Sequence, residues 1–113
     1  LRSPVEAVVP AHGSVVIDTG VHVEIPEGYT IFLKSKSGLN VKHNLIGEGV
    51  VDALYTGSIK VKLYNLGDID YQILRGDKII QMVILPCAYC EFTRVDKFAE
   101  TERGDGGFGS TGR

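Results

Sequence analysis

Apolar and polar residues alternate with a period of two through most of this chain, and this pattern limits it to β structure. Residues 21–25, 29–33 and 59–63 place apolar side chains at every second position, which is typical of strands with one buried face. Residues 15–17 and 82–85 are continuous apolar runs, which we expect to form strands buried on both faces. The sequence therefore predicts an all-β fold.

Turn-forming residues separate these segments at short intervals. Pro26, Glu27 and Gly28 combine a fixed φ with a glycine that tolerates positive φ, and similar turns are expected at residues 54–57, 65–68 and 75–77. Many short strands indicate a sandwich, barrel or jelly roll, and 113 residues suffice for one domain. Residues 37–43 lack alternation, and we expect one short helical turn capped by Ser37, whose free N–H groups suit a phosphate.

Charge and hydropathy argue against two kinds of partner. The net charge of −2 does not favour stable nucleic-acid binding or attachment to a membrane surface, because both need an excess of Lys and Arg. No apolar run approaches the roughly 18 residues of a membrane span. The chain opens at Leu1 without Met or a signal-peptide pattern, and we expect native residues upstream of it.

The two cysteines, Cys87 and Cys90, form a single C-x-x-C motif. A structural zinc site needs four ligands, and the three histidines are scattered along the chain without ligand spacing. A redox pair is expected beside a βαβ pattern, which the sequence lacks. We therefore expect strand residues with free thiols, in a reducing intracellular compartment such as the cytoplasm or nucleus.

The C-terminal residues 100–113 are rich in glycine and nearly free of core residues. A flexible tail is one interpretation. The other is a segment that grips a nucleotide, because Phe108 stands alone between glycines, with Arg103, Ser110 and Thr111 nearby. Phe can stack on a planar group, while Arg and hydroxyl groups can hold phosphates. Chemistry alone leaves these two interpretations open.

Four segments together resemble the dUTPase family in order and spacing. They are KSGL at 36–39, GVVDALYTGSI at 49–59, GDKIIQM at 76–82 and GGFGSTG at 106–112, which are similar to the family's second to fifth motifs. The resemblance runs over the whole chain, and the Asp-Tyr hairpin with the glycine-rich tail is highly specific to this family.

The resemblance implies a β jelly roll assembled as a homotrimer, with three active sites at subunit interfaces. Residues 1–99 would form the core, and residues 100–113 an arm that closes over the nucleotide of a neighbouring subunit. The implied reaction is hydrolysis of dUTP to dUMP and pyrophosphate, which keeps uracil out of DNA and supplies dUMP for dTTP synthesis.

The resemblance also assigns roles within the hairpin. Asp52 would be the general base that activates a water for attack on the α-phosphorus; a carboxylate that caps a turn is the alternative. Tyr55 would pack under the deoxyribose and exclude a 2′-hydroxyl, or serve as a cross-strand packing residue. Main-chain groups of the hairpin would read uracil, among residues Gly49, Val51, Ser58 and Ile59.

Phosphate contacts are expected from polar and cationic residues of the other motifs. Lys36, often Arg in the family, would supply a point charge, and Phe108 with Gly109 would cover the uracil ring. For Gln81 the alternative is a strand residue facing solvent, and Lys34, Lys60 and Lys62 are expected on solvated faces. The remaining expected contacts are Ser37, Gly38, Arg103, Ser110 and Thr111.

The family's metal is Mg²⁺, which the resemblance implies as a cofactor held largely by the triphosphate. The first motif, whose Asp helps to place the metal, is absent, and we expect that Asp upstream of Leu1. Without it, the chain is expected to bind or turn over its substrate poorly. Three rivals are a dCTP deaminase of the same superfold, a non-catalytic regulator that binds dUTP or a protein, and a plain structural β domain.

Overall fold

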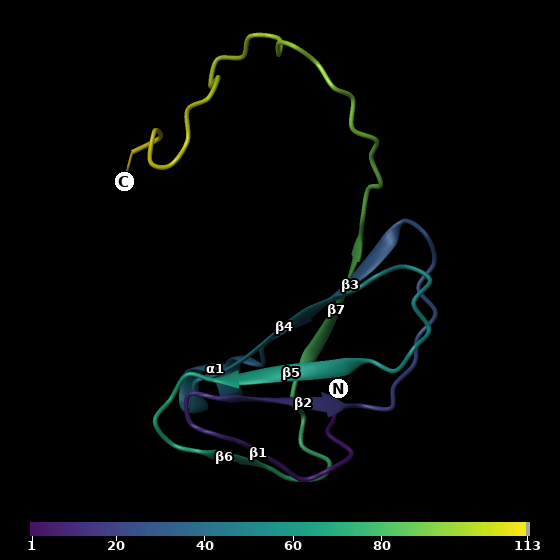
Figure 1. Ribbon diagram of the computed structural model, residues 1–113, viewed down its shortest axis with the longest axis vertical. Helices are drawn as coiled ribbons and strands as arrows, with labels where there is room; N and C mark the ends of the chain where they lie inside the picture. Colours follow the sequence, from purple (N-terminus) through teal and green to yellow (C-terminus); the bar gives the residue numbers. More distant parts are fainter. Residues whose placement is uncertain (113) are drawn as a thin grey trace.

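The computed structural model describes residues 1–112, and Arg113, the last residue of the expected arm, lies outside them. The described residues form seven strands and one helix (Figure 1). In chain order the elements are β1 (Ala7–Val9), β2 (Ser14–Asp18), β3 (Tyr29–Lys34), α1 (Ser37–His43), β4 (Leu45–Val51), β5 (Lys60–Asn65), β6 (Tyr71–Ile73) and β7 (Gln81–Pro86). The predicted all-β class is confirmed, and the expected strands at 29–33 and 59–63 correspond to β3 and β5.

The strands form two antiparallel sheets. One contains β1 and β6, and the other has the order β2-β5-β4-β3-β7. Both sheets contribute to a single core, because alternate residues of the strands point inward. The core consists of Val9, Ile17, Ile25, Ile31, Leu33, Leu45, Val51, Ile59, Val61, Leu63, Ile73, Ile79 and Ile80.

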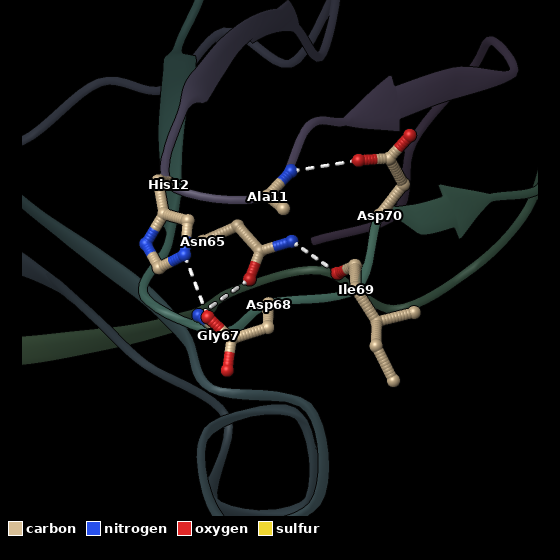
Figure 2. A network of polar contacts seen from close by, with 7 residues as sticks. All are labelled: Ala11, His12, Asn65, Gly67, Asp68, Ile69 and Asp70. Carbon is tan, nitrogen blue, oxygen red and sulfur yellow. Dashed lines mark hydrogen bonds and ion pairs between the residues drawn. The ribbon is translucent and has the colours of Figure 1, made fainter.

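The fully buried Asn65 joins the two sheets at one end (Figure 2). Its Nδ2 donates to the carbonyl oxygens of Val9 and Ile69, at 3.0 and 2.8 Å, and its Oδ1 accepts from Gly67 N–H at 2.9 Å. Both donor hydrogens of this side chain and its oxygen therefore have partners, as a buried amide requires. An exposed pair adds a second link, with His12 Nε2 and Asp68 Oδ1 2.7 Å apart. It joins the loop between β1 and β2 to the loop between β5 and β6.

The expectation of a strand at 21–25 is wrong. The segment keeps the alternation of burial, with Ile25 inside and His22 and Glu24 outside, but it belongs to no sheet. Its main chain is hydrogen-bonded to the loop before β5: Ile59 N–H donates to Val21 O, and Leu54 N–H to Ile25 O. A period of two reports an extended chain with one face on the core, and it does not show that a neighbouring strand is available.

The apolar runs at 15–17 and 82–85 are not buried on both faces. Val16 in β2 is 57% exposed and Ile84 in β7 is 59% exposed. These two strands are the edges of the five-stranded sheet, and only their inner faces meet the core of this chain. Their outer faces leave apolar side chains uncovered.

Two smaller expectations also need correction. Ser37 does not cap α1, because the N-cap residue is Lys36 and no side chain caps the helix there. The hydroxyl group of the preceding Ser35 is hydrogen-bonded to both main-chain groups of Gly47, at 3.0 and 3.1 Å. Cys87 and Cys90 are free thiols as expected, but they follow β7, whose pairing with β3 ends at Pro86. The expected turn at Pro26 to Gly28 is confirmed, with Gly28 at φ 89°.

The C-terminal segment leaves the end of β7 and sweeps away from both sheets (Figure 1). The radius of gyration is 19.0 Å, whereas a compact chain of this length is expected near about 13 Å. The difference reflects an arm that does not fold back onto its own core. Among the described residues, the one helix is too short to cross a membrane.

Candidate active site

The central feature of the site is a change of partner along β4. Its first residues pair with β5, from Leu45↔Asn65 to Gly47↔Leu63. Its last residues, 48–51, pair with β3 instead. Continuing the first register would bring Gly49 opposite Val61, yet that pairing is not made. The hairpin of β4 and β5 therefore opens beyond Gly47, and two strand edges face each other across a gap.

Gly47 lies at the point where β4 changes partner, and no side chain fits there. A Cβ atom there would overlap Ile80 Cδ1 and would stand 3.0 Å from Leu63 Cδ2. The core therefore reaches the β4 backbone at the point where its partner changes. A glycine is the residue that allows such a close approach.

The gap is a hollow of about 300 Å³. It collects every hairpin residue that the sequence assigned to the substrate, together with Leu33, Val50 and Lys60. Lys60 is exposed, as expected, but it also borders the hollow, which the sequence did not indicate. The expected residues that line it are Gly49, Val51, Asp52, Tyr55, Ser58 and Ile59.

Asp52 and Tyr55 are placed by a tight turn at the end of β4. Tyr55 N–H donates to Asp52 O at 3.2 Å, and Leu54 between them has a φ of 69°. A positive φ at this position is typical of a type II turn, and it is strained for a leucine. Asp52 is exposed, and its carboxylate accepts no hydrogen bond from residues 1–112. The carboxylate can therefore accept one from water.

Tyr55 is fixed at the other side of the turn. Its hydroxyl group donates to Ser58 O at 2.9 Å, and its ring lies against Gly57. The ring is 44% exposed, so one part packs on the loop while another faces the hollow. Both roles considered for Tyr55, packing and contact with a ligand, are compatible with this position.

The β5 side of the hollow is supported by residues 18–21. Ser58 Oγ donates to Asp18 Oδ1, and Gly20 N–H donates to both of these oxygens at 3.1 Å. The Ser58 hydrogen bond, followed by that from Gly20, holds the pKa of Asp18 below its ordinary value. The Ile59 main chain is likewise occupied, since its N–H donates to Val21 O and its C=O accepts from Thr19. Main-chain groups available to a ligand therefore belong to other hairpin residues.

A second hollow, of about 440 Å³, collects three of the four phosphate contacts expected outside the arm. Lys36, Ser37 and Gln81 line it, together with Lys78, Met82, Ile80 and Leu1. Gly38 follows Ser37 in the first turn of α1. The Gln81 amide does not simply face solvent, because its Nε2 donates to Ser35 O at 2.9 Å.

Positive charge converges on this second hollow. The side chains of Lys36 and Lys78 both line it. Two neighbouring cations form a favourable site for an anion. Lys78 was not singled out from the sequence, although its position three residues before Gln81 in the fourth motif could have drawn attention to it.

The expected arm residues lie apart from both hollows. Arg103 Nε donates to Gly106 O at 2.7 Å, and Ser110 N–H donates to Gly107 O at 3.1 Å, so these hydrogen bonds stay within the arm. Phe108 is fully exposed, with a φ of 48°. Gly109 and Thr111 belong to the same turns. The two hollows share no residue, and within the described chain neither one includes a residue of the arm.

Solved structures match this architecture closely. A mutant of Staphylococcus bacteriophage 80alpha dUTPase, determined with dUpNHpp, superposes with a TM-score of 0.89 at 31% identity, covering 100% of this chain and 84% of that one. A mutant dUTPase from phage phi11 of S. aureus, described with a structural Mg(II) ion, gives a TM-score of 0.80 at 30% identity, covering 87% of this chain and 82% of that one. The fold is thus the jelly roll of a class of nucleotidohydrolases.

Sequence comparison is more specific. The dUTPase family model matches residues 1–112. The deoxyuridine 5′-triphosphate nucleotidohydrolase of Arabidopsis thaliana is 42% identical over 113 residues, which cover 99% of this chain and 68% of the plant protein. The chain spans between 64% and 74% of the length of the curated relatives it matches. The chain belongs to the dUTPase family.

Proposed function

We propose that this protein hydrolyses dUTP to dUMP and pyrophosphate, with Asp52 as the base that activates the attacking water. The observation that carries the proposal is the opened hairpin, where Asp52 and Tyr55 stand at the mouth of a hollow bordered by two unpaired strand edges. By limiting dUTP, the reaction would keep uracil out of DNA and supply dUMP for dTTP synthesis.

The strand edges are suited to uracil. The free edge of a β-strand presents N–H and C=O groups in the plane of the sheet, and the uracil edge carries a matching imide N–H and carbonyl oxygens. Cytosine presents a different pattern of donors and acceptors. Each buried main-chain group left unpaired by a wrong base costs about 1–3 kcal/mol. The base therefore takes the place of part of the missing pairing between β4 and β5.

Asp52 has the exposure that a water-activating carboxylate needs. It can accept a hydrogen bond from a water molecule and take up its proton as the oxygen attacks the α-phosphorus. Tyr55, fixed to Ser58 O and facing the hollow, would contact the deoxyribose and leave no room for a 2′-hydroxyl. Discrimination against UTP would then depend on the position of this ring.

The phosphates require residues from more than one subunit. The cationic hollow around Lys36, Lys78 and Gln81 is separate from the hairpin hollow, and the arm reaches neither in its own chain. A homotrimer resolves this separation, with residues 1–99 as the core and residues 100–113 closing over a neighbour's nucleotide. The uncovered apolar side chains of Val16 and Ile84 support such an assembly. Within the arm, Phe108 would stack on uracil, and Arg103, Ser110 and Thr111 would bind the phosphates.

Mg²⁺ fits this arrangement as an ion that arrives with the triphosphate. Among residues 1–112, no group of three or more His, Cys, Asp or Glu side chains is placed to hold a metal. Mg²⁺ commonly keeps several waters and binds phosphate oxygens with one or two carboxylates, so the donor set on this chain is compatible with it. When bound, the ion would neutralise phosphate charge. The side chains of Lys36 and Lys78 would orient the same oxygens.

The test is pyrophosphate release from dUTP in the presence of Mg²⁺, run beside dCTP, dTTP and UTP. We expect selective hydrolysis of dUTP, and a loss of about 10²- to 10⁴-fold in kcat for Asp52→Asn with binding of dUTP retained. Light scattering should give three times the mass of one chain. Release of ammonia from dCTP, without pyrophosphate release from dUTP, would indicate a deaminase instead. Binding of dUTP with no hydrolysis, even when an upstream segment carrying the first-motif Asp is restored, would indicate a nucleotide-binding regulator.

A further inference from the structure

Residues 18–21 lie along the β5 side of the hairpin hollow and hold it through several hydrogen bonds. Thr19 contributes twice, since its N–H and its Oγ1 both donate to Ile59 O, at 3.0 and 2.6 Å. Val21 O accepts from Ile59 N–H at 2.9 Å. These contacts fix the Ile59 backbone, but they do not reach the loop that carries Tyr55.

Asp18 extends the support to that loop. Its Oδ1 accepts from Ser58 Oγ, and Gly20 N–H closes the arrangement by donating to both oxygens. The main-chain oxygen of the same Ser58 accepts from the Tyr55 hydroxyl at 2.9 Å. One residue, Ser58, therefore connects the Asp18 carboxylate to the Tyr55 ring.

We infer that Asp18 is a positioning residue that sets the place of the Tyr55 ring through Ser58, and thereby the discrimination between dUTP and UTP. The inference rests on the proposed function for its catalytic readout, while the positioning itself is a property of the free protein. Asp18 does not line the hollow and touches no reacting group, so its effect on a ligand is indirect.

The charge of Asp18 has a second, separable effect. Lys60 and His22 are the charged and titratable groups that act on it, and Lys60 also lines the hollow. Removing the carboxylate charge would leave Lys60 less compensated and would favour an anionic ligand. Asp18→Asn removes the charge and keeps an oxygen that can accept from Ser58 and Gly20. Asp18→Ala removes both.

The matched pair of variants separates these effects. For Asp18→Ala we expect KM for dUTP to rise about 3- to 10-fold and kcat to stay within about twofold. The ratio of kcat/KM for dUTP to kcat/KM for UTP should fall about 3- to 10-fold, which is the effect of losing one hydrogen bond. For Asp18→Asn the ratio should stay close to that of the wild type. An equal loss of selectivity in both variants, or no loss in Asp18→Ala, would overturn the inference.

A second measurement is independent of activity. Aromatic ¹H–¹³C spectra of the full chain, with the Tyr55 signals assigned by Tyr55→Phe, should show those signals displaced in Asp18→Ala and nearly unchanged in Asp18→Asn. Urea unfolding of both variants checks that the fold is retained. If the wild type failed to hydrolyse dUTP while the Tyr55 signals moved as expected, the proposed function would fail and the positioning role would stand. Unmoved Tyr55 signals in a folded Asp18→Ala would overturn the positioning role.

Discussion

The ring of Tyr55 lies so close to Gly57 that a methyl group on Gly57 would stand 2.5 Å from the Tyr55 hydroxyl oxygen and 2.6 Å from the carbon that bears it. The tyrosine is thus held between a bond to Ser58 and the bare backbone of Gly57. The position of the ring therefore depends both on the missing side chain of Gly57 and on the hydrogen bond to Ser58.

Gly57→Ala should therefore displace the Tyr55 ring without unfolding the protein, because the ring is partly exposed and can move outward. We expect kcat/KM for dUTP to fall by about tenfold, equivalent to 1.4 kcal/mol, with reduced preference over UTP. Steady-state kinetics on both nucleotides measure this effect. In a Tyr55→Ala background the same substitution should cost almost nothing further; a full additional loss there would contradict the explanation.

Gly47→Ala should act on stability, because its new methyl group would overlap Ile80 Cδ1 in a filled core. We expect a loss of about 1–3 kcal/mol in the free energy of unfolding, measured by urea denaturation. Ile80→Val removes the overlapping atom, so the double variant should recover part of that loss. If Ile80→Val and Gly47→Ala were simply additive, the overlap would not be the cause.

Deletion of residues 100–113 should separate stability from activity. The hydrogen bonds of residues 100–112 stay within the arm, so the thermal midpoint should barely change. Hydrolysis of dUTP should fall by roughly 10²-fold, because the nucleotide loses the residues that close over it. Phe108→Ala is the milder companion variant and should lose less. A deletion that melted the core would show that the arm is part of it.

Asp18 should make stability depend on pH in a defined direction. Its pKa is lowered from the ordinary value of 3.8, chiefly by the Ser58 hydrogen bond. Its ionised form therefore stabilises the fold above the unfolded pKa, and this contribution is lost as the pH falls through the lower folded pKa. The difference in urea midpoint between wild type and Asp18→Asn should be constant near neutral pH and should shrink in strong acid. A difference that grew on acidification would contradict this assignment.

The thiols of Cys87 and Cys90 should both react with a disulfide reagent in the folded protein. Cys90 is exposed and Cys87 is partly buried, so two phases are expected, with Cys90 the faster. Cys90→Ser should remove the fast phase alone. A protein that showed no reactive thiol after reduction and desalting would be inconsistent with this structure.

Alternation predicted β3 and β5, where a partner strand is available, but it did not single out β1, β4 or β6. Residues 29–33 and 59–63 proved to be strands, while 21–25 has the same alternation and no ladder. Alternation depends only on which side chains face the core, and pairing depends on where another strand lies. The apolar runs 15–17 and 82–85 were misjudged for a related reason, since they form sheet edges whose outer faces this chain leaves uncovered.

Most residues of the candidate site were predicted from the sequence, but the way in which the strands bring them together was not. The hairpin residues were assigned together, and they line one hollow. The sequence did not show that the hollow arises from β4 exchanging partners, because that depends on a register fixed by distant strands. Asp18 was missed for the same reason, since it meets Ser58 across 40 positions of sequence. Lys78 was within a quoted motif, but its side chain could be placed beside Lys36 only by the fold.

The exchange of partners by β4 has a consequence for the empty protein. Two strand edges that are close to pairing are kept apart by the ladders on their other sides, β3 for β4 and β2 for β5. Closure of the hairpin would require one of those ladders to slip by breaking its own bonds. The cavity is thus kept open because β4 and β5 are each held by a ladder on the other side. Its width should vary as little as the spacing within the sheet, and we expect the cavity to be formed before any ligand binds.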